Sequence, residues 1–392
     1  MILQHFTNRR PPINSLWLAW LYLRRRRVAA SVMVAGVALA LYLPLATHWA
    51  ADAFDEALGA RAAATPMIVG ARGSRFDLVL HGLYFRARSE GTVAHGEFTA
   101  LHEAGHGRVI PLHAQFTAGG QPVVGTSLDY FDFRNLQLAR GESMALLGDC
   151  VLGANAAQKL TLSPGDKLKT DRKNLFDLAG DYPLQLNVTG VLAATGTADD
   201  EGVFVDVKTA WIIAGLGHGH DAQETNATNS PSAKLVKTHL EITPENMSTF
   251  HFHGDTTALP LTAILVEPVD AKETAMVMGR FQNSGTLQAL KPPMVVDEMM
   301  GMVMQVRQFL DANYALVASA MGLLLALIVA LSRRLRAREM ETLFLLGCSR
   351  STQFALQAAE LLIIFAIAIA IALAAAWATV GWARDYLNTL AG

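Results

Sequence analysis

The chain has 392 residues, a formal net charge of −2 at pH 7 and a hydrophobic fraction of 52%. A charge this close to neutral gives no support for a nucleic-acid-binding protein, because such proteins usually carry a strongly basic surface. The hydrophobic fraction is high for a soluble enzyme, and it predicts a few membrane-spanning helices joined to a large domain in water.

The first 49 residues predict a helix on the membrane surface followed by a transmembrane helix. Residues 14–23 are apolar and aromatic, and four consecutive arginines follow at positions 24–27. Tryptophan and tyrosine favour the headgroup region, and short basic segments stay in the cytoplasm. We therefore expect an amphipathic cytoplasmic helix within residues 1–27 and a membrane span at residues 28–49. The alternative, a cleaved signal peptide, is disfavoured because no small-residue cleavage site follows Pro44.

Residues 50–311 contain no apolar run of span length, so we expect them to form a domain outside the cytoplasm. Short apolar runs predict strands at residues 66–69, 76–80, 108–112, 122–125, 184–192, 203–207 and 261–266. Residues 96–102 predict a helix, and the expected fold class is therefore α+β. Cys150 lies in this domain and Cys348 in a cytoplasmic segment, so no internal disulfide is expected.

The rest of the chain predicts two more spans around a short basic connection. The apolar runs at residues 312–332 and 356–381 are each long enough to cross the bilayer, and a periplasmic tail follows at 382–392. Arginines at positions 333, 334, 336 and 338 place residues 333–355 in the cytoplasm. Within this coupling segment, Gly347 followed by Ser349 predicts the end of one helix and the cap of the next. The prediction is a membrane protein with three transmembrane helices and a large extracytoplasmic α+β domain.

This connection resembles the signature R-R-E-I … L-G-A-S-R … E of the FtsX/MacB-type permeases of ABC transporters. Residues 338–340 (Arg-Glu-Met), residues 346–350 (Leu-Gly-Cys-Ser-Arg) and Glu360 carry the resemblance. It implies that the segment receives the movement of an ATPase. The residues expected to take part are Arg338, Glu339, Leu343, Gly347, Ser349 and Glu360.

The resemblance continues into the external region. The phrases at residues 123–126, 146–160, 163–166, 188–192 and 203–205 are similar, in order, to a MacB-like periplasmic core domain. This likeness implies a ferredoxin-like porter subdomain at about 60–125 and 258–295, with a mostly β insertion at about 126–257. Family members usually have four spans, and this sequence predicts three. Either this variant lacks the fourth helix, or a partner supplies it.

The resemblance implies the membrane (permease) subunit of a MacB/FtsX-type ABC complex in the bacterial inner membrane. The sequence has no G-x-x-x-x-G-K-[ST] motif, so ATP is expected on a separate ATPase subunit, in two copies, and this chain is not expected to be an enzyme. The other expected partners are a second copy of the chain, membrane lipid, and a periplasmic adaptor or metal-carrying protein. The alternative function is that of an FtsX-like signal transmitter, which activates a periplasmic partner without transport.

Two H-x-H pairs in the external domain are candidate ligands for Zn²⁺. They are His218 with His220, and His251 with His253. On an extended strand, residues two apart share a face, so each pair offers two imidazoles to one ion, and neutral imidazole suits zinc. The alternative is that both pairs lie in ordinary solvated loops.

A further motif, His102-Glu103-Ala104-Gly105-His106, matches the zinc-protease pattern H-E-x-x-H. That chemistry requires both histidines on one helical turn, with the glutamate beside the metal-bound water. Because Gly105 and Gly107 flank the second histidine, we expect the helix to end before His106. A metalloprotease is therefore a distant alternative.

Overall fold

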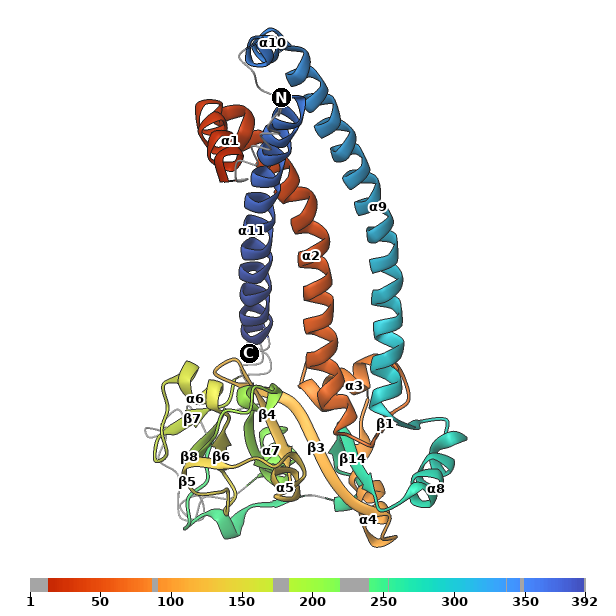
Figure 1. Cartoon of the computed structure of the whole chain (residues 1–392). Helices are drawn as coiled ribbons and strands as arrows, with labels where there is room; N and C mark the ends of the chain where they lie inside the picture. Colours follow the sequence, from red (N-terminus) through yellow and green to blue (C-terminus); the bar gives the residue numbers. More distant parts are fainter. Residues whose placement is uncertain are drawn as a thin grey trace, which may run out of the picture. The chain divides into compact units, whose positions relative to one another are not determined.

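The computed structural model describes residues 13–86, 91–171, 183–218, 240–252, 254–335, 337–345 and 349–390. The chain divides into two compact units, whose elements are labelled in Figure 1. Met1–Asp55 and Gly301–Asp385 form a helical unit. Glu56–Met300 and Tyr386–Gly392 form a unit that contains both strands and helices, called the mixed unit below.

The helical unit contains three long helices and two shorter ones among the described residues. They are α1 (Ile13–Arg25), α2 (Arg27–Ala63), α9 (Pro292–Leu335), α10 (Ala337–Leu345) and α11 (Arg350–Leu390). Among the described residues, three helices are long and apolar enough to cross a membrane, namely α2, α9 and α11. The spans expected at residues 28–49, 312–332 and 356–381 lie within these helices, which extend well beyond them.

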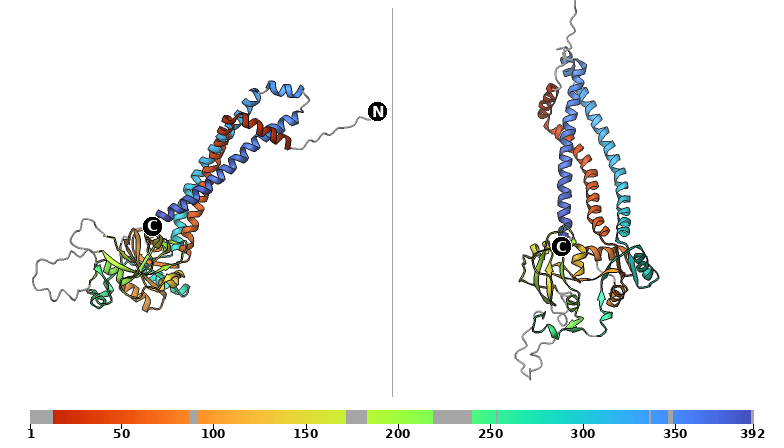
Figure 2. Two further views of the ribbon diagram at one scale, coloured as in Figure 1. Left: turned by 90° about the vertical axis from the view of Figure 1, so that its left-hand side faces the viewer. Right: turned by 60° about the horizontal axis from the view of Figure 1, so that its bottom comes forward.

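The three long helices run alongside one another (Figure 2). Apolar side chains from all three meet between them. One buried cluster contains Val37 and Ala38 of α2, Leu325 of α9 and Ala368 of α11. Two hydrogen bonds between helices join the hydroxyls of Tyr42 and Thr379, 2.9 Å apart, and those of Thr47 and Tyr314, 2.8 Å apart. Because an unpaired polar group in hydrocarbon costs several kcal/mol, these pairs favour one packing of the helices.

An 11-stranded sheet forms the centre of the mixed unit. Its main path has the order β11-β8-β6-β9-β4-β3-β14-β1-β15, and β5 and β7 also pair with β8. The strands are β1 (Met67–Ala71), β3 (Gly107–Ala118), β4 (Gln121–Thr126), β5 (Leu138–Gly141), β6 (Asp149–Leu152), β7 (Lys167–Lys169), β8 (Leu184–Leu192), β9 (Val203–Asp206), β11 (Leu240–Glu241), β14 (Ala263–Pro268) and β15 (Leu287–Leu290). Two short two-stranded sheets pair β2 (Val93–Ala94) with β13 (Pro260–Leu261), and β10 (Gly217–His218) with β12 (His251–Phe252).

Strand β3 joins the two halves of the large sheet. Its first part pairs antiparallel with β14, and its last part pairs with β4 after a register shift between His113 and Phe116. Such an irregularity bends the strand. The part of β3 before it contributes Val109 to one apolar core, and the part after it contributes Phe116 and Ala118 to another. Strand β4 then pairs parallel with β9. The sheet is thus continuous across residue 126, where the sequence predicts the start of the insertion.

Helices of the mixed unit flank the sheet. They are α3 (Arg75–Tyr84), α4 (His95–Glu103), α5 (Asp129–Arg134), α6 (Ala154–Leu160), α7 (Val207–Ile213) and α8 (Ala271–Gln282). Helix α3 shows that the strand predicted at residues 76–80 is wrong. The Ser74 side chain caps this helix by accepting from the Asp77 amide at 3.2 Å, and the buried face includes Leu78, Val79 and Leu83. A short continuous apolar run does not distinguish a buried strand from a buried helix face.

The remaining predicted elements agree with the structure. The six other predicted strands overlap with β1, β3, β4, β8, β9 and the pair β13 and β14. The predicted helix at residues 96–102 lies within α4. The fold is thus a mixture of strands and helices with long apolar helices at both ends of the described chain.

Candidate functional site

Helix α10 carries the first part of the predicted coupling segment. Arg338 and Glu339 lie in its first turn, and Leu343 lies about one turn later. Arg338 is exposed, and its main-chain oxygen accepts a hydrogen bond from the Thr342 hydroxyl at 2.9 Å. Leu345, the last residue of the helix, is 81% exposed. Arginine and large apolar side chains are typical of protein interfaces, so this helix is suited to contact with another protein.

Ser349 caps the helix that follows. The amide of Thr352 donates to the Ser349 hydroxyl at 3.2 Å, and α11 begins at Arg350. This is the usual geometry of a serine at the position before a helix. The helix start that the sequence predicts at Ser349 is therefore present. Gly347, at which a bend is predicted, lies outside the described residues.

Glu360 lies apart from the other predicted coupling residues. It follows Ser349 by 11 residues on α11, a rise of about 16 Å along the helix axis. There it lines a pocket of about 220 Å³, together with residues of α1, α2 and α9. Among the described residues with family resemblance, Glu360 thus lies about 16 Å along the helix axis from Ser349.

Two of the four candidate zinc ligands lie on neighbouring strands. Strands β10 and β12 pair antiparallel, and His218 stands opposite His251 in the register. His251 is exposed, and its Nδ1 lies 3.0 Å from the main-chain oxygen of Thr249. His220 and His253 lie outside the described residues. In the part of the chain that the structure describes, no three metal-binding side chains are close enough to hold an ion.

The two histidines of the H-E-x-x-H motif belong to different elements. Helix α4 ends at Glu103, Gly105 has a φ of +68°, and β3 begins at Gly107 with a φ of +117°. Both values lie in the region that favours glycine, so the helix cannot continue through the motif. His106 instead pairs with Glu273 of α8, with 2.5 Å between Nδ1 and Oε2. The prediction that the helix ends before His106 is confirmed.

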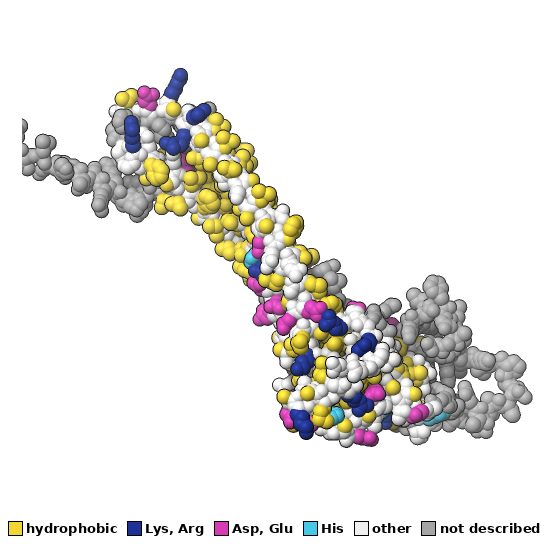
Figure 3. All heavy atoms as spheres, turned by 90° about the vertical axis from the view of Figure 1, so that its right-hand side faces the viewer, with side chains coloured by type: hydrophobic (Ala, Val, Ile, Leu, Met, Phe, Trp, Pro, Cys, Tyr) yellow, Lys and Arg dark blue, Asp and Glu magenta, His cyan; other side chains and the backbone are white. Residues whose placement is uncertain are grey.

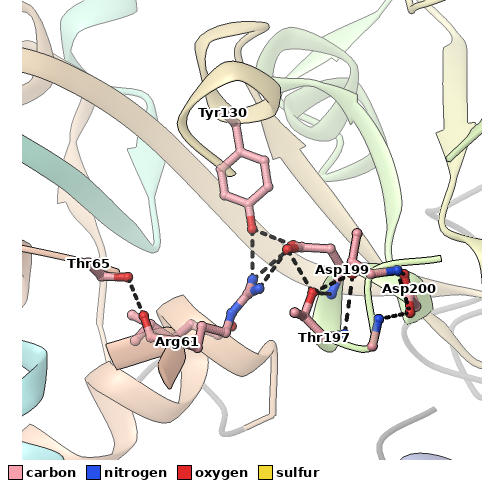
Figure 4. Close-up of polar contacts among 9 residues, drawn as sticks. Arg61, Thr65, Tyr130, Thr197, Asp199 and Asp200 are labelled. Atoms are coloured by element: carbon pink, nitrogen blue, oxygen red, sulfur yellow. Dashed lines mark hydrogen bonds and ion pairs between the residues drawn. The ribbon is translucent and has the colours of Figure 1, made fainter. Parts of the chain in front are cut away.

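A buried ion pair in the mixed unit was not predicted from the sequence (Figure 4). Arg61, near the end of α2, donates to both carboxylate oxygens of Asp199, at 2.6 Å from Nη1 and 2.8 Å from Nη2. The Tyr130 hydroxyl donates to the same carboxylate at 2.6 Å. Arg61 is 7% exposed, Asp199 1% and Tyr130 0%. The Nε of Arg61 also donates to the main-chain oxygen of Leu83 in α3.

The charges of this cluster compensate one another. Burial alone would raise the pKa of Asp199, but the Arg61 charge and the hydrogen bonds from Arg61 and Tyr130 hold this pKa below its usual range. Burial and the neighbouring Asp199 raise the pKa of Tyr130 to about 12, so its hydroxyl keeps its proton and remains a donor. The cluster therefore joins the end of α2 to α3, to α5 and to the 3₁₀ turn η1 (Ala198–Glu201).

The sequence contains only weak signals for this cluster. Arg61 is a single cation in an alanine-rich stretch, and Asp199 begins an acidic run at residues 199–201. The two residues are 138 positions apart. Periodicity and capping rules act over a few residues, so they give no reason to pair these two charges.

Comparison with known proteins identifies a family. The profile of the MacB-like periplasmic core domain matches residues 33–241, which is more than half of the 392 residues. The periplasmic region of MacB from Actinobacillus actinomycetemcomitans aligns at 11% identity with a TM-score of 0.36, covering 62% of this chain and 95% of that one. The extracellular domain of the noncanonic ABC-type transporter YknZ from Gram-positive bacteria aligns at 11% identity with a TM-score of 0.33, covering 57% and 98%. Scores this low support no argument about function, and a search of the curated proteins found no match.

We expect the ion pair of Arg61 with Asp199 to stabilise the mixed unit. Replacing Asp199 by Asn leaves Arg61 buried without a counter-charge, and removing one partner of a buried pair costs about 3–5 kcal/mol. We expect the melting temperature of the mixed unit, followed in the purified full chain, to fall by roughly 10 °C. The exposed Asp132 on α5 provides the control Asp132→Asn, which should leave the melting temperature unchanged. Equal melting temperatures for Asp199→Asn and wild type would show that the pair does not stabilise the fold.

The stability that the Arg61–Asp199 pair contributes decreases as the pH falls. Because the pKa of Asp199 is lowered in the folded state, the pair contributes its full stability above the unfolded value of about 3.9. This contribution is lost as the pH falls further, through the lowered folded pKa. Wild type should therefore lose its stability advantage over Asp199→Asn on acidification below about pH 4.

Proposed function

Because the chain belongs to the FtsX/MacB-type permease family through its MacB-like periplasmic core domain, we propose that it is the permease subunit of an ABC-type transporter. The observation that carries this proposal is the family match over residues 33–241. The match begins within α2, a candidate membrane span, and continues through the mixed unit to β11. The span and the mixed unit thus belong to one family architecture.

In this proposal the chain transmits movement and does not hydrolyse ATP. A separate ATPase subunit, in two copies, binds α10 and the start of α11 in the cytoplasm. The exposed Arg338 and Leu345 of α10 and the Ser349 cap of α11 support this assignment. Arg338, Glu339, Leu343, Gly347 and Ser349 then form the receiving surface, whereas Glu360 acts at the pocket among the helices.

Continuous helices support the transmission of movement. Helix α2 has 37 residues and α9 has 44, which correspond to about 56 Å and 66 Å of helix. Each contributes residues to both units of the chain. The buried ion pair of Arg61 fixes the last turn of α2 within the mixed unit, so a displacement of that turn reaches the sheet through α3, α5 and η1.

The proposed location is the bacterial inner membrane, with the mixed unit in the periplasm. A second copy of the chain would cover the apolar faces of α9 and α11, on which Leu323, Leu327, Ile369 and Leu373 are exposed. A periplasmic adaptor is the expected partner of the mixed unit. The alternative, a transmitter that activates a periplasmic partner without transport, uses the same mechanics and differs in what the mixed unit binds.

We also propose that the mixed unit binds zinc. The support is the pairing of β10 with β12, which sets His218 opposite His251 and so brings one histidine of each H-x-H pair to one small sheet. Neutral imidazole nitrogens are good ligands for Zn²⁺. His220 and His253 would complete the set of four.

The ATPase interface can be tested by reversing one charge. In cells that express the tagged chain with its native partners, the purified wild-type complex should contain a subunit with a P-loop and should hydrolyse ATP. We expect Arg338→Glu to reduce the co-purified ATPase about tenfold, because a charge reversal places like charges at the interface. The matched control is Arg140→Glu on the exposed strand β5. Equal yields of ATPase from Arg338→Glu and the control would contradict the proposed interface.

Topology can be tested by labelling single cysteines. In a chain with Cys348→Ser, we expect an impermeant thiol reagent to label Ser163→Cys in intact spheroplasts, because Ser163 is exposed in the mixed unit. Ser332→Cys, at the end of α9 that leads to the basic connection, should react only after the membrane is opened. Strong labelling of Ser332→Cys in intact spheroplasts would reverse the proposed orientation.

Zinc binding can be tested by calorimetry on the full chain. We expect wild type to bind one Zn²⁺ at micromolar concentration, and binding to weaken on acidification because protons compete with the metal for imidazole nitrogens. Alanine at His218, His220, His251 and His253 should abolish it, whereas alanine at His102 and His106 should not. If the quadruple variant binds zinc as wild type does, the site is elsewhere.

A further inference from the structure

The pocket of about 220 Å³ lies in the helical unit, among α1, α2, α9 and α11. Apolar side chains of three helices line its wall, including Met33 of α2, Ile328 of α9 and Leu361 of α11. Ile328 lies within one candidate span, Leu361 within another and Met33 within the third. The wall therefore consists of residues that the bilayer hydrocarbon would surround.

Two arginines and one glutamate supply the charges of the pocket lining. Arg26 lies at the junction of α1 and α2, and Arg333 lies near the end of α9; both are exposed. The guanidinium of Arg26 also lies 5.3 Å from the ring centroid of Tyr22. The carboxylate in the lining belongs to Glu360, which is half-buried and has interactions of its own. Figure 3 shows basic side chains gathered at one end of the helical unit, beside a largely apolar surface.

The arginines and the apolar wall occupy successive levels along the helices. Arg333 follows the end of a candidate span, Leu331, by two residues. Ile328 precedes Arg333 by five residues, or about 7.5 Å along the helix. The headgroup layer on each side of a bilayer is about 5–8 Å thick. The spacing thus sets Arg333 at headgroup level when Ile328 is in hydrocarbon.

We propose that this pocket binds one anionic phospholipid. Its phosphate is held by Arg26 and Arg333, and the first part of one acyl chain lies against Met33, Ile328 and Leu361. Guanidinium groups bind phosphate with paired hydrogen bonds, and basic pockets between transmembrane helices hold anionic headgroups. The assignment to the cytoplasmic leaflet rests on the orientation given under Proposed function.

Size and chemistry favour a lipid over a soluble anion. The pocket is smaller than the range of about 300–1,000 Å³ that encloses a drug-sized ligand, so it accommodates part of one chain while the rest stays in the bilayer. A soluble phosphate would use the arginines and leave the apolar wall unfilled. A phospholipid contacts both the arginines and the apolar wall. The carboxylate of Glu360 repels a second anion beside the bound phosphate.

The test is native mass spectrometry of the purified full chain, released from nanodiscs that contain equal amounts of phosphatidylglycerol and phosphatidylcholine. We expect wild type to retain one phosphatidylglycerol and little phosphatidylcholine. The double variant Arg26→Gln/Arg333→Gln should retain about tenfold less. The matched control is Arg24→Gln/Arg334→Gln, which removes the same charge from neighbouring arginines that do not line the pocket. A second variant, Ala30→Trp, fills the pocket without changing charge and should also lose the lipid.

Each outcome decides the proposal. Loss of lipid in the pocket variants alone supports it. Equal loss in both double variants would show general attraction to a basic surface, and no retained lipid in wild type would overturn the site. Displacement of the lipid by millimolar inorganic phosphate would assign the arginines to a soluble anion. A second copy of the chain in place of lipid would appear as a dimer whose stability depends on Arg26 and Arg333. The experiment contains no nucleotide, so its failure is distinct from failure of the ATPase interface.

Discussion

The burial of the Arg61 guanidinium is the constraint on which the mixed unit depends. A cation taken out of water is tolerated only when a counter-charge and hydrogen-bond acceptors of good geometry surround it. Here Asp199 supplies the charge, the Tyr130 hydroxyl accepts from Nη2 of Arg61, and the main-chain oxygen of Leu83 accepts from Nε. An apolar contact would hold the end of α2 in several nearby positions. A bidentate ion pair holds it in one position, and this difference matters if α2 transmits movement as proposed.

A second constraint acts at the basic end of the helical unit. The arginines of the coupling segment are expected to fix its side of the membrane, because short basic segments stay in the cytoplasm. One of them, Arg333, lines the pocket among the helices together with Arg26 of the α1–α2 junction. The proposed topology, ATPase contact and lipid binding therefore depend on different sets of arginines in the helical unit. The bound lipid would then stabilise the packing of α2, α9 and α11, and with it the placement of α10 for contact with the ATPase.

Local signals in the sequence were sufficient for much of this fold. The long apolar runs, the Ser349 cap and the glycines around His106 all act within a few residues, and the structure agrees with each of these predictions. The run at residues 76–80 was misassigned because a fully buried strand and one buried face of a helix share the same composition. Long-range features were not predictable. Neither the ion pair of Arg61 with Asp199 nor the pocket lined by Glu360 produces a periodic pattern in the sequence.

The central claim is that the state of a cytoplasmic ATPase changes the conformation of the mixed unit. Hydrogen exchange of the purified complex in nanodiscs, with and without trapped ATP, tests it most directly. The account predicts that ATP changes the protection of backbone amides in α3, α5 and the turn that carries Asp199, in addition to α10. It also predicts that this distant change is lost in Asp199→Asn while the change in α10 remains. Exchange differences confined to α10 and the start of α11 would contradict the account.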